Sequence, residues 1–407
     1  MASKLSQTLL AGLLLAGLTS LPAAARRNDP DTIRIAACGD VMMQNQNGGS
    51  RLPDKSLARF MSAMRPLFLA ADVAYVNLEG PIGGSLPKNC RAGRCYRFSQ
   101  SPLTARTLSD AGVNIAGVAN NHAADMGETG QQSTRTALAL QGIDTVGYFD
   151  VPSISWQLKH QRKVRMLAFS ANSFAPDFRR PEALQQIQLA KRENEVLVIA
   201  VHMGCEGERC ARIPGGAEWY QGENRGDPVA FARAAIDAGA DLVLGSGPHV
   251  PRALEVYRER LIAYSLGNCA VGPGIDSSGK AGWAPLLTVT VDREGRLLNW
   301  DVASFRNNRS GVILDEQELA LRWMLDATAG DFGQGSQQLL LSYWNRSVLS
   351  LKSTWGERLV HRLINTVDQA APVPIQTAVN VANSLSRNGR TPDSSPIRTA
   401  QMSNGPR

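Results

Sequence analysis

Short apolar runs that end in a polar or charged side chain recur along this chain, and they constrain its fold more than any other feature. Polar residues at the ends of buried strands are where α/β folds place their chemistry. One such run is ordinary, but five indicate a single assembled site. The five runs, each with its polar ending, are 33–39 with Asp40, 73–78 with Glu79, 113–118 with Asn120, Asn121 and His122, 196–201 with His202, and 242–244 with His249.

Helical patterns alternate with the first of these runs, at 57–69, 101–111, 131–141 and 228–238. Later strand-like runs at 164–169, 261–265 and 286–291 lack long intervening helices. Alternating βα units followed by a strand-rich half predict an α/β fold with two packed sheets flanked by helices.

The character of the chain changes beyond residue 305. We predict helices at 316–327, 337–351 and 357–367, and then a tail rich in Pro, Ser, Asn and Arg. Such a composition is typical of disorder. The predicted organisation is therefore a core at 32–305, a small helical appendage at 306–370 and a disordered tail at 371–407.

Residues 1–25 have the pattern of a secretory signal peptide. Lys4 precedes the apolar run 9–21, and the alanines at 23–25 supply a small-residue cleavage site. The run is short for a membrane span, and no later stretch approaches the roughly 20 apolar residues that a span needs. We predict a periplasmic or secreted protein with no transmembrane span after cleavage; an uncleaved membrane anchor is the alternative.

The cysteines agree with export. Two pairs bracket tight polar loops, and we predict a local disulfide for each, as in an oxidising compartment. The alternative, a thiolate metal site, requires the two pairs to lie close together. The other two cysteines stand in apolar, strand-like contexts and are predicted to be buried thiols. The pairs are Cys90 with Cys95 and Cys205 with Cys210, and the predicted thiols are Cys38 and Cys269.

The chain carries a formal net charge of +7. It has neither a dense Lys/Arg block nor a basic stripe interleaved with aromatic residues, which argues against nucleic acid as a partner. An anionic envelope polymer suits this charge better, although a merely basic surface is the simpler interpretation.

Asp40 and Glu79 are the candidate carboxylate ligands. A carboxylate that follows a strand and a glycine is a common metal ligand, and a helix cap or turn is the alternative for Asp40. Asn77 and Glu79 share one strand face because Leu78 points the other way. Two polar side chains on an otherwise apolar strand need partners, which a metal or a hydrogen-bonded turn would supply.

The histidines add proton-transfer and ligand chemistry. His122 and Asp125 are three residues apart and share a face if a helix begins there, so the imidazole could act as a general acid that Asp125 orients. A capping cluster is the alternative. His202 precedes Glu206 by four residues, and His249 lies on a Gly-rich loop that permits close approach to a ligand.

Taken together, these segments resemble the poly-γ-glutamate capsule synthesis family (CapA type), which is related to the calcineurin-like metallophosphatases. The matching segments follow the family's order and span 33–272. They are 39–42, 77–79, 120–122 with Asp125 and Gly127, 202–204 with Glu206, 245–250 and 264–268.

The resemblance implies a four-layer α/β/β/α metallophosphatase-like sandwich with a metal centre between the sheets. It implies one or two divalent ions (Mn, Fe or Zn), with His122 as the general acid beside them and Asp125 as its partner. The implied metal ligands are Asp40, Glu79, Asn121, His202 and His249. The predicted substrate-binding residues are Asn77, Asn120, Glu206 and Asn268.

Three positions depart from the family pattern. Met42 stands where metallophosphatases place a histidine, Gly247 where many relatives carry a second histidine, and Met203 where the family often has tryptophan. The loss of two imidazoles favours a single metal, or a metal held by fewer protein ligands and more water.

The leading functional hypothesis is an exported, metal-dependent hydrolase or transferase that acts on a capsule or envelope polymer of the poly-γ-glutamate type, with envelope assembly partners. A second hypothesis is a non-catalytic polymer-binding or export-assembly protein on the same scaffold. A third is a phosphoesterase that acts on small phosphorylated substrates. Chelator sensitivity separates the first from the second, and a panel of phosphoesters separates the third.

Overall fold

The computed structural model describes residues 30–44, 52–84, 97–172 and 175–345. The predicted signal peptide, the Cys90–Cys95 pair, the helix at 357–367 and the tail from 371 lie outside the described residues.

The first sheet has eight strands in the order β16-β15-β14-β1-β2-β3-β4, with β13 paired to β1. Strands β1 to β4 are parallel, and β14 to β16 continue the sheet antiparallel from the other side of β1. The strands are β1 (Thr32–Met42), β2 (Val73–Leu78), β3 (Ile115–Gly117), β4 (Asp144–Val146), β13 (Asn268–Val271), β14 (Trp283–Asp292), β15 (Leu297–Asn308) and β16 (Gly311–Leu314).

The second sheet has six strands in the order β11-β12-β10-β7-β6-β5, of which β12, β10, β7 and β6 are parallel. They are β5 (Ser153–Gln157), β6 (Lys163–Ser170), β7 (Glu195–His202), β10 (Leu242–Ser246), β11 (Leu254–Tyr257) and β12 (Arg260–Ala263). A separate hairpin pairs β8 (Trp219–Tyr220) with β9 (Glu223–Asn224).

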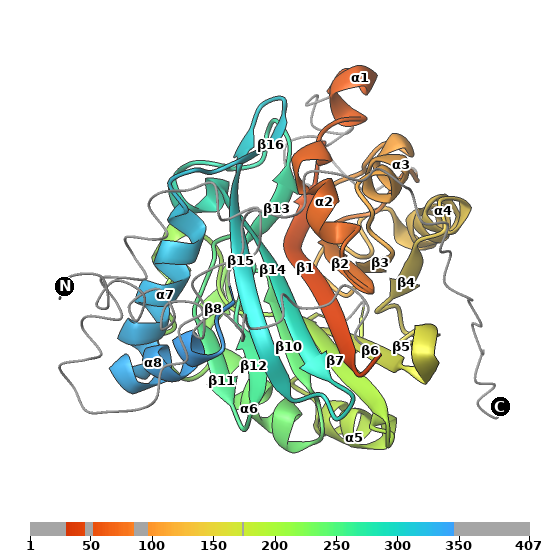
Figure 1. The fold of residues 1–407 in the computed structure, drawn as a ribbon. Coiled ribbons are helices and arrows are strands. Elements are labelled where there is room, and N and C mark those ends of the chain that lie inside the picture. The colour runs from red at the N-terminus through yellow and green to blue at the C-terminus, as the bar shows by residue number, and fades with distance from the viewer. Residues whose placement is uncertain (1–29, 45–51, 85–96, 173–174, 346–407) are drawn as a thin grey trace, which may run out of the picture.

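Three apolar layers hold the sheets and helices together. The alternation of side chains along β1 sends Ile35 into the core between the two sheets and Ala36 into the core beneath the helices of the first sheet. A third core lies between the second sheet and its helices. The helices are α1 (Asp54–Leu57), α2 (Arg65–Phe68), α3 (Leu103–Asp110) and α4 (Gly127–Leu140) on the first sheet, and α5 (Pro181–Ala190) and α6 (Pro228–Asp237) on the second (Figure 1). The predicted four-layer α/β/β/α sandwich is confirmed.

The C-terminal helices α7 (Leu319–Phe332) and α8 (Gln334–Ser342) lie beside the sandwich (Figure 1). They match two of the predicted helices with shifted bounds. Leu321 and Met324 of α7 join the core between the sheets, and the Trp300 indole of β15 donates to the Leu340 carbonyl. Strands β15 and β16 run past residue 305, while the division into a core and an appendage stays a prediction.

The helix predicted at 57–69 is broken into α1, a 3₁₀ turn (Ser62–Met64) and α2. Pro66 explains the break. It lacks the N–H that would donate to the Ser62 carbonyl, and its ring clashes with a continuous helix.

The prediction of buried thiols at Cys38 and Cys269 is wrong, because these residues form a disulfide with a Cα–Cα distance of 5.4 Å. Strand β13 lies parallel to β1 with Asp40 opposite Asn268, which brings together two cysteines 231 residues apart. The predicted Cys205–Cys210 disulfide is confirmed. Structural disulfides are typical of proteins outside the cytoplasm. Within the described ranges, every helix is too short or too polar to cross a membrane.

Candidate metal centre

The carboxyl ends of strands from both sheets converge on one buried polar cluster. In the first sheet, Asp40 of β1 lies opposite Asn77 of β2, and Glu79 is the first residue after β2. In the second sheet, His202 of β7 lies opposite Ser246 of β10. Because parallel strands deliver their carboxyl ends to the same edge, the two sheets present these side chains to each other.

Asp40, Glu79 and His249 form the centre of this cluster. Each offers one ligand atom, and these atoms lie within 4.8 Å of one another. Nδ1 of His249 is 3.0 Å from Asp40 Oδ2 and 3.5 Å from Glu79 Oε2. His202 completes the group, with Nε2 3.8 Å from Glu79 Oε1. This is a mixed oxygen and imidazole donor set.

Two buried atoms of the cluster, Glu79 Oε1 and His202 Nε2, lack a hydrogen-bond partner within the described part of the chain, as do Asn121 Oδ1 and Glu206 Oε1. Burying such atoms unpaired costs free energy. A cation beside Glu79 Oε1 and His202 Nε2, which lie 3.8 Å apart, would satisfy both atoms, provided that the His202 proton sits on Nδ1, where Ser246 Oγ lies 3.2 Å away to accept it. The residues therefore fit a divalent metal such as Mn, Fe or Zn.

The carboxylates of the cluster titrate differently because their neighbours differ. Burial alone would raise the pKa of Asp40, but the hydrogen bond and charge of His249, with smaller effects from His202 and Asn77, lower it. Burial raises the pKa of Glu79 to about 7, and the negative charge of Asp40 adds to this rise. Asp40 is thus the permanent anion of the pair.

The pKa values of His202 and His249 also shift in opposite directions. Burial lowers the pKa of His202 to about 3, so this ring is neutral and has a lone pair for a metal. Burial would also lower the pKa of His249, but Glu79 and Asp40 outweigh it and raise the pKa to about 10. Without a metal, the positive charge on His249 offsets the carboxylates. Metal binding would displace that proton.

The asparagines predicted to bind substrate form hydrogen bonds with residues in and around the cluster. Asn77 Nδ2 donates to Asp40 Oδ1 at 2.7 Å, and Asn120 Nδ2 donates to the Leu78 carbonyl at 2.9 Å. Asn268 donates to the Ala281 carbonyl at 3.0 Å, and its Oδ1 lies 3.2 Å from Nδ1 of His249. Their amides are engaged within the protein, and substrate binding by these residues stays a prediction.

His122 and Asp125 meet as their spacing predicts, with 2.8 Å between Nδ1 and Oδ2. The helix assumed for this contact begins later, at Gly127, and a turn closed by Asp125 N and the His122 carbonyl makes the contact instead. Asp125 also accepts from Phe98 N, and the Phe98 ring packs edge-on against the imidazole. Burial would lower the pKa of His122, but Asp125 and Glu79 raise it, which favours the protonated form.

The backbone at Gly247 explains why this position carries no ligand. Its φ is +114°, and a Cβ there would lie 2.8 Å from the Met203 carbonyl oxygen. Met42 is buried, and its Cε would lie 3.6 Å from a Cβ on Gly80. Neither position brings an imidazole to the cluster.

Ser246 and Arg225 also belong to the site, and neither is predicted from the sequence. Ser246 ends β10 as His202 ends β7, so the strand-end pattern could have identified it. Arg225 contacts Glu206 at 3.2 Å from a hairpin 19 residues further along the chain, and no local pattern points to it.

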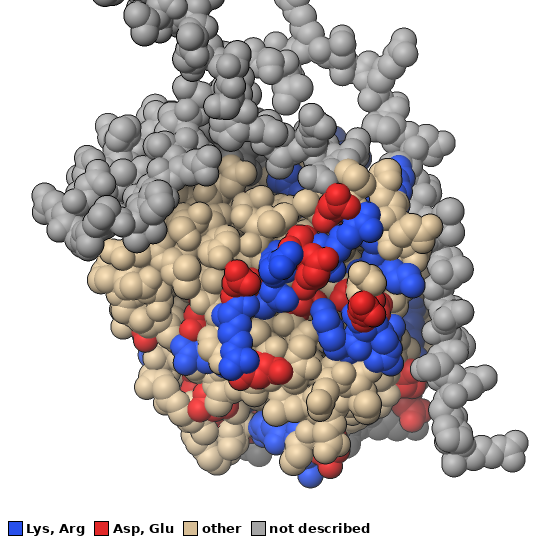
Figure 2. Space-filling model, turned by 60° about the horizontal axis from the view of Figure 1, so that its bottom comes forward, with Lys and Arg blue, Asp and Glu red and all other residues tan. Residues whose placement is uncertain are grey.

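The strand ends opposite the cluster carry paired charges. Asp241, directly before β10, forms ion pairs with Lys191 and Arg260. Glu195, at the start of β7, forms an ion pair with Arg165. Figure 2 shows Lys and Arg interspersed with Asp and Glu over this side of the molecule. Basic side chains on this side are therefore paired with carboxylates.

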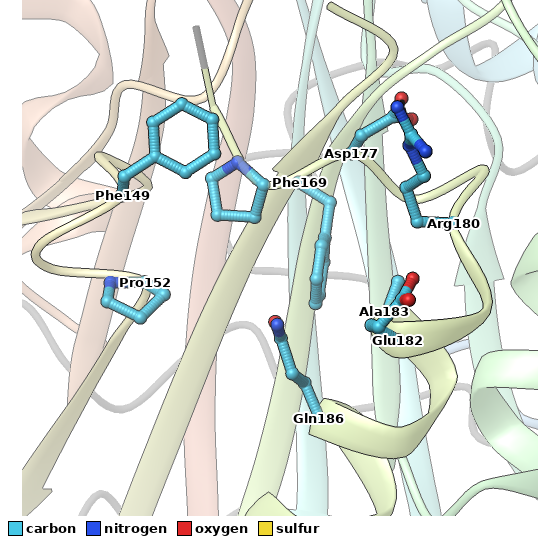
Figure 3. A pocket seen from close by; sticks show the side chains of 9 residues that line it. Phe149, Pro152, Phe169, Asp177, Arg180, Glu182, Ala183 and Gln186 are labelled. Carbon is cyan, nitrogen blue, oxygen red and sulfur yellow. Dashed lines mark ion pairs between the residues drawn. The ribbon is translucent and has the colours of Figure 1, made fainter. Parts of the chain in front are cut away.

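A separate pocket of about 200 Å³ lies between the segment after β4 and the start of α5 (Figure 3). Phe169 of β6 forms its floor, Phe149 and Pro152 stand on one side, and Asp177 and Arg180 stand on the other (Figure 3). Its lining includes none of the residues of the polar cluster.

The fold and the cluster define a two-sheet α/β sandwich protein with a carboxylate–histidine centre at its strand ends. A family model described as "Bacterial capsule synthesis protein PGA_cap" matches residues 34–272, which include the cluster from Asp40 to Asn268. The chain belongs to this family.

Named relatives agree with this membership. The chain is 26% identical over 283 residues to "PGA biosynthesis protein CapA" of Bacillus subtilis (strain 168), covering 65% of this chain and 70% of that one. It is 26% identical over 278 residues to "Capsule biosynthesis protein CapA" of Bacillus anthracis, covering 63% and 64%. It is 29% identical over 270 residues to a "Probable polyglutamine synthesis accessory protein" of Mycobacterium tuberculosis (strain ATCC 25618 / H37Rv), covering 59% and 67%.

Solved structures are more distant. A hypothetical protein from Thermus thermophilus matches with a TM-score of 0.42 and 14% identity, covering 68% of this chain and all of that one. A 5'-nucleotidase precursor from the same organism matches with a TM-score of 0.36 and 12% identity, covering 74% and 59%.

Proposed function

We propose that this protein is an exported, metal-dependent hydrolase or transferase that acts on a capsule or envelope polymer of the poly-γ-glutamate type. The observation that carries the proposal is the convergence of Asp40, Glu79 and His249 around buried atoms that lack partners among the described residues. Family membership and the names of the relatives support the polymer as substrate class.

Five side chains would hold the metal: Asp40, Glu79, Asn121, His202 and His249. When bound, a divalent cation polarises a carbonyl or phosphoryl oxygen and lowers the pKa of a bound water. The negative charge of Asp40 and the neutral ring of His202 suit such a cation.

His122 would donate a proton to the leaving group. Asp125 holds its Nδ1, so Nε2 is the nitrogen left to deliver the proton. The edge of Phe98 fixes the ring from the side. The hydrogen bond to Asp125 and the charge of Glu79 raise the pKa of His122, which favours the protonated form that a general acid needs.

Elemental mass spectrometry of the chain from Arg26 onward, purified without chelator, tests the centre. We expect stoichiometric Mn, Fe or Zn, and its loss in an Asp40→Ala, His202→Ala double variant. A protein that stays free of metal after reconstitution with each ion would overturn the proposal.

Turnover is tested with poly-γ-glutamate of defined length. Size-exclusion chromatography should reveal shortened or rearranged chains in the presence of metal, and excess chelator should stop the change. If the polymer binds and its length distribution stays constant under all metal conditions, the catalytic role is excluded.

The second candidate is a non-catalytic polymer-binding or export-assembly protein. The backbone at Gly247, which leaves no space for a ligand side chain, and the buried Met42 favour this alternative because both reduce the imidazoles available to a metal. It predicts polymer binding that is insensitive to chelator, measured by co-sedimentation.

A further inference from the structure

The Cys205–Cys210 disulfide closes a short loop next to His249. The Gly207 amide in this loop donates to the Pro248 carbonyl at 2.9 Å, directly before His249. The Met203 amide donates to the Ser246 carbonyl at 2.9 Å. The loop is therefore attached to the segment that carries the histidine.

Glu206 in this loop approaches His249 from the side away from the carboxylate pair. Nδ1 of the imidazole faces Asp40 and Glu79, whereas Nε2 lies 3.7 Å from Glu206 Oε2. A histidine that binds a metal through one nitrogen commonly gives its other N–H to a carboxylate, which fixes the ring and its tautomer.

A buried arginine forms an ion pair with Glu206. The Arg225 side chain is 8% exposed, its Nη2 lies 3.2 Å from Glu206 Oε1, and its Nε lies 3.1 Å from Glu223 Oε2. Arg225 belongs to the segment that follows β9, and its carbonyl accepts from the Gly204 amide at 3.0 Å.

A second buried pair fastens this hairpin to the disulfide loop. Glu218 accepts from the Cys205 amide at 2.8 Å and from both terminal nitrogens of Arg252, at 2.9 and 2.8 Å. Arg252 also donates to the Cys210 carbonyl at 2.6 Å. Hydrogen bonds and ion pairs thus connect the disulfide loop, the hairpin and the segment that carries His249.

We propose that Glu206 is a positioning residue that orients His249 toward the metal, with Arg225 and the disulfide loop as its support. This inference rests on the proposed metal centre. It gives Glu206 a different role from the substrate contact predicted from the sequence. A carboxylate at this position would repel an anionic polymer, and the Arg225 guanidinium lies 3.2 Å from its other oxygen.

Metal affinity of the full chain, measured by competition with a chromophoric chelator for Zn²⁺ and Mn²⁺, tests the proposal. Glu206→Gln should weaken binding by about 10- to 100-fold, the usual effect of losing such a partner. The matched control is Glu208→Gln in the same disulfide loop, because Glu208 is largely exposed and pairs with Lys280. The control should bind metal like the parent protein.

Glu206→Asp keeps the charge and shortens the reach, so it should give an intermediate loss, and it serves as the test if Glu206→Gln fails to fold. Equal affinity in the parent and in folded Glu206 variants would overturn the positioning role.

Ring ¹⁵N spectra of the metal-free protein separate this inference from the metal proposal. The His249 signals, assigned with a His249→Asn variant, should shift in Glu206→Gln and stay in place in Glu208→Gln. If the parent protein binds no metal and the His249 signals still shift in Glu206→Gln, the metal proposal is contradicted while the Glu206–His249 contact is supported. Unchanged His249 signals would remove the contact itself.

Discussion

Single glycines determine how closely the strand-end loops approach one another. A Cβ on Gly39 would lie 1.9 Å from the Gly267 carbonyl oxygen, which accepts from the Asp40 amide at 2.8 Å. Gly247 donates its amide toward Asp40 Oδ2 at 3.4 Å. The ligand cluster is therefore compact because backbone, rather than side chain, fills the space around Asp40.

Gly247→His should fail to restore the imidazole that many relatives carry. The new Cβ would meet the Met203 backbone, and a positive φ strains any side chain, so we expect a lower melting temperature and an unchanged metal stoichiometry. Differential scanning calorimetry and elemental analysis provide the two readouts. A second bound ion with undiminished stability would contradict this interpretation.

His122→Ala should reduce metal-dependent turnover by about 10²- to 10⁴-fold, the usual contribution of a general acid. Metal content should be retained, because His122 contacts Asp125 rather than the metal ligands through its Nδ1. The rate of polymer cleavage and the bound metal are measured on the same preparation. Unchanged turnover would remove His122 from the mechanism, and lost metal would make it a ligand.

At the scale of elements, a fully buried ion pair lies at the base of the β8–β9 hairpin. Arg252 is fully buried, and Glu218 supplies both oxygens to it. Removing one partner of such a pair leaves an uncompensated charge in the interior. The hairpin that carries Arg225 is thus fixed by Glu218 at its base rather than by an apolar core of its own.

Glu218→Ala should lower the free energy of unfolding by about 3–5 kcal/mol, because Arg252 would lose its buried counter-ion. Urea unfolding measures the change. Asp110→Ala provides the control, since its pair with Arg106 is solvent-exposed and such pairs contribute less than about 1 kcal/mol. Similar losses in both variants would show that water reaches Arg252.

Elements with strong local patterns were predictable. Strands β1, β7 and β10 combine an apolar run with the polar residues Asp40, His202 and His249 at or after it, and α6 has an amphipathic pattern followed by Gly239. The β8–β9 hairpin and strand β13 were not predicted from the sequence, because each is short and is specified by residues distant in the chain. The broken helix at 57–69 shows how Pro66 overrides an apolar period.

At the scale of the whole molecule, the predicted ligands converge because two sheets present the same ends to each other. The order of the motifs carried the family resemblance, and that resemblance implied the sandwich and the set of candidate ligands. The residues that contact these side chains and their neighbours were not predictable, since Ser246 and Arg225 reach the site through tertiary packing. The same holds for the Cys38–Cys269 disulfide, which depends on the pairing of β13 with β1.

The two disulfides should stabilise the chain unequally. In the chain-entropy model the Cys38–Cys269 link, with a sequence separation of 231, restricts the unfolded chain far more than the Cys205–Cys210 link, by about 3 kcal/mol. Denaturant unfolding of the two double alanine variants compares them. Equal losses would mean that local packing, rather than loop closure, sets the contribution of each disulfide.

The disulfide between β1 and β13 also has a consequence for the order of biogenesis. Cys38 stands two residues before Asp40, and Cys269 directly follows Asn268, so the covalent link ties together the two strand ends that flank His249. In a reducing cytoplasm the newly made chain would lack this link. On the proposed export route, the centre would mature only after translocation, and the proposed polymer-modifying activity would stay silent inside the cell that makes it.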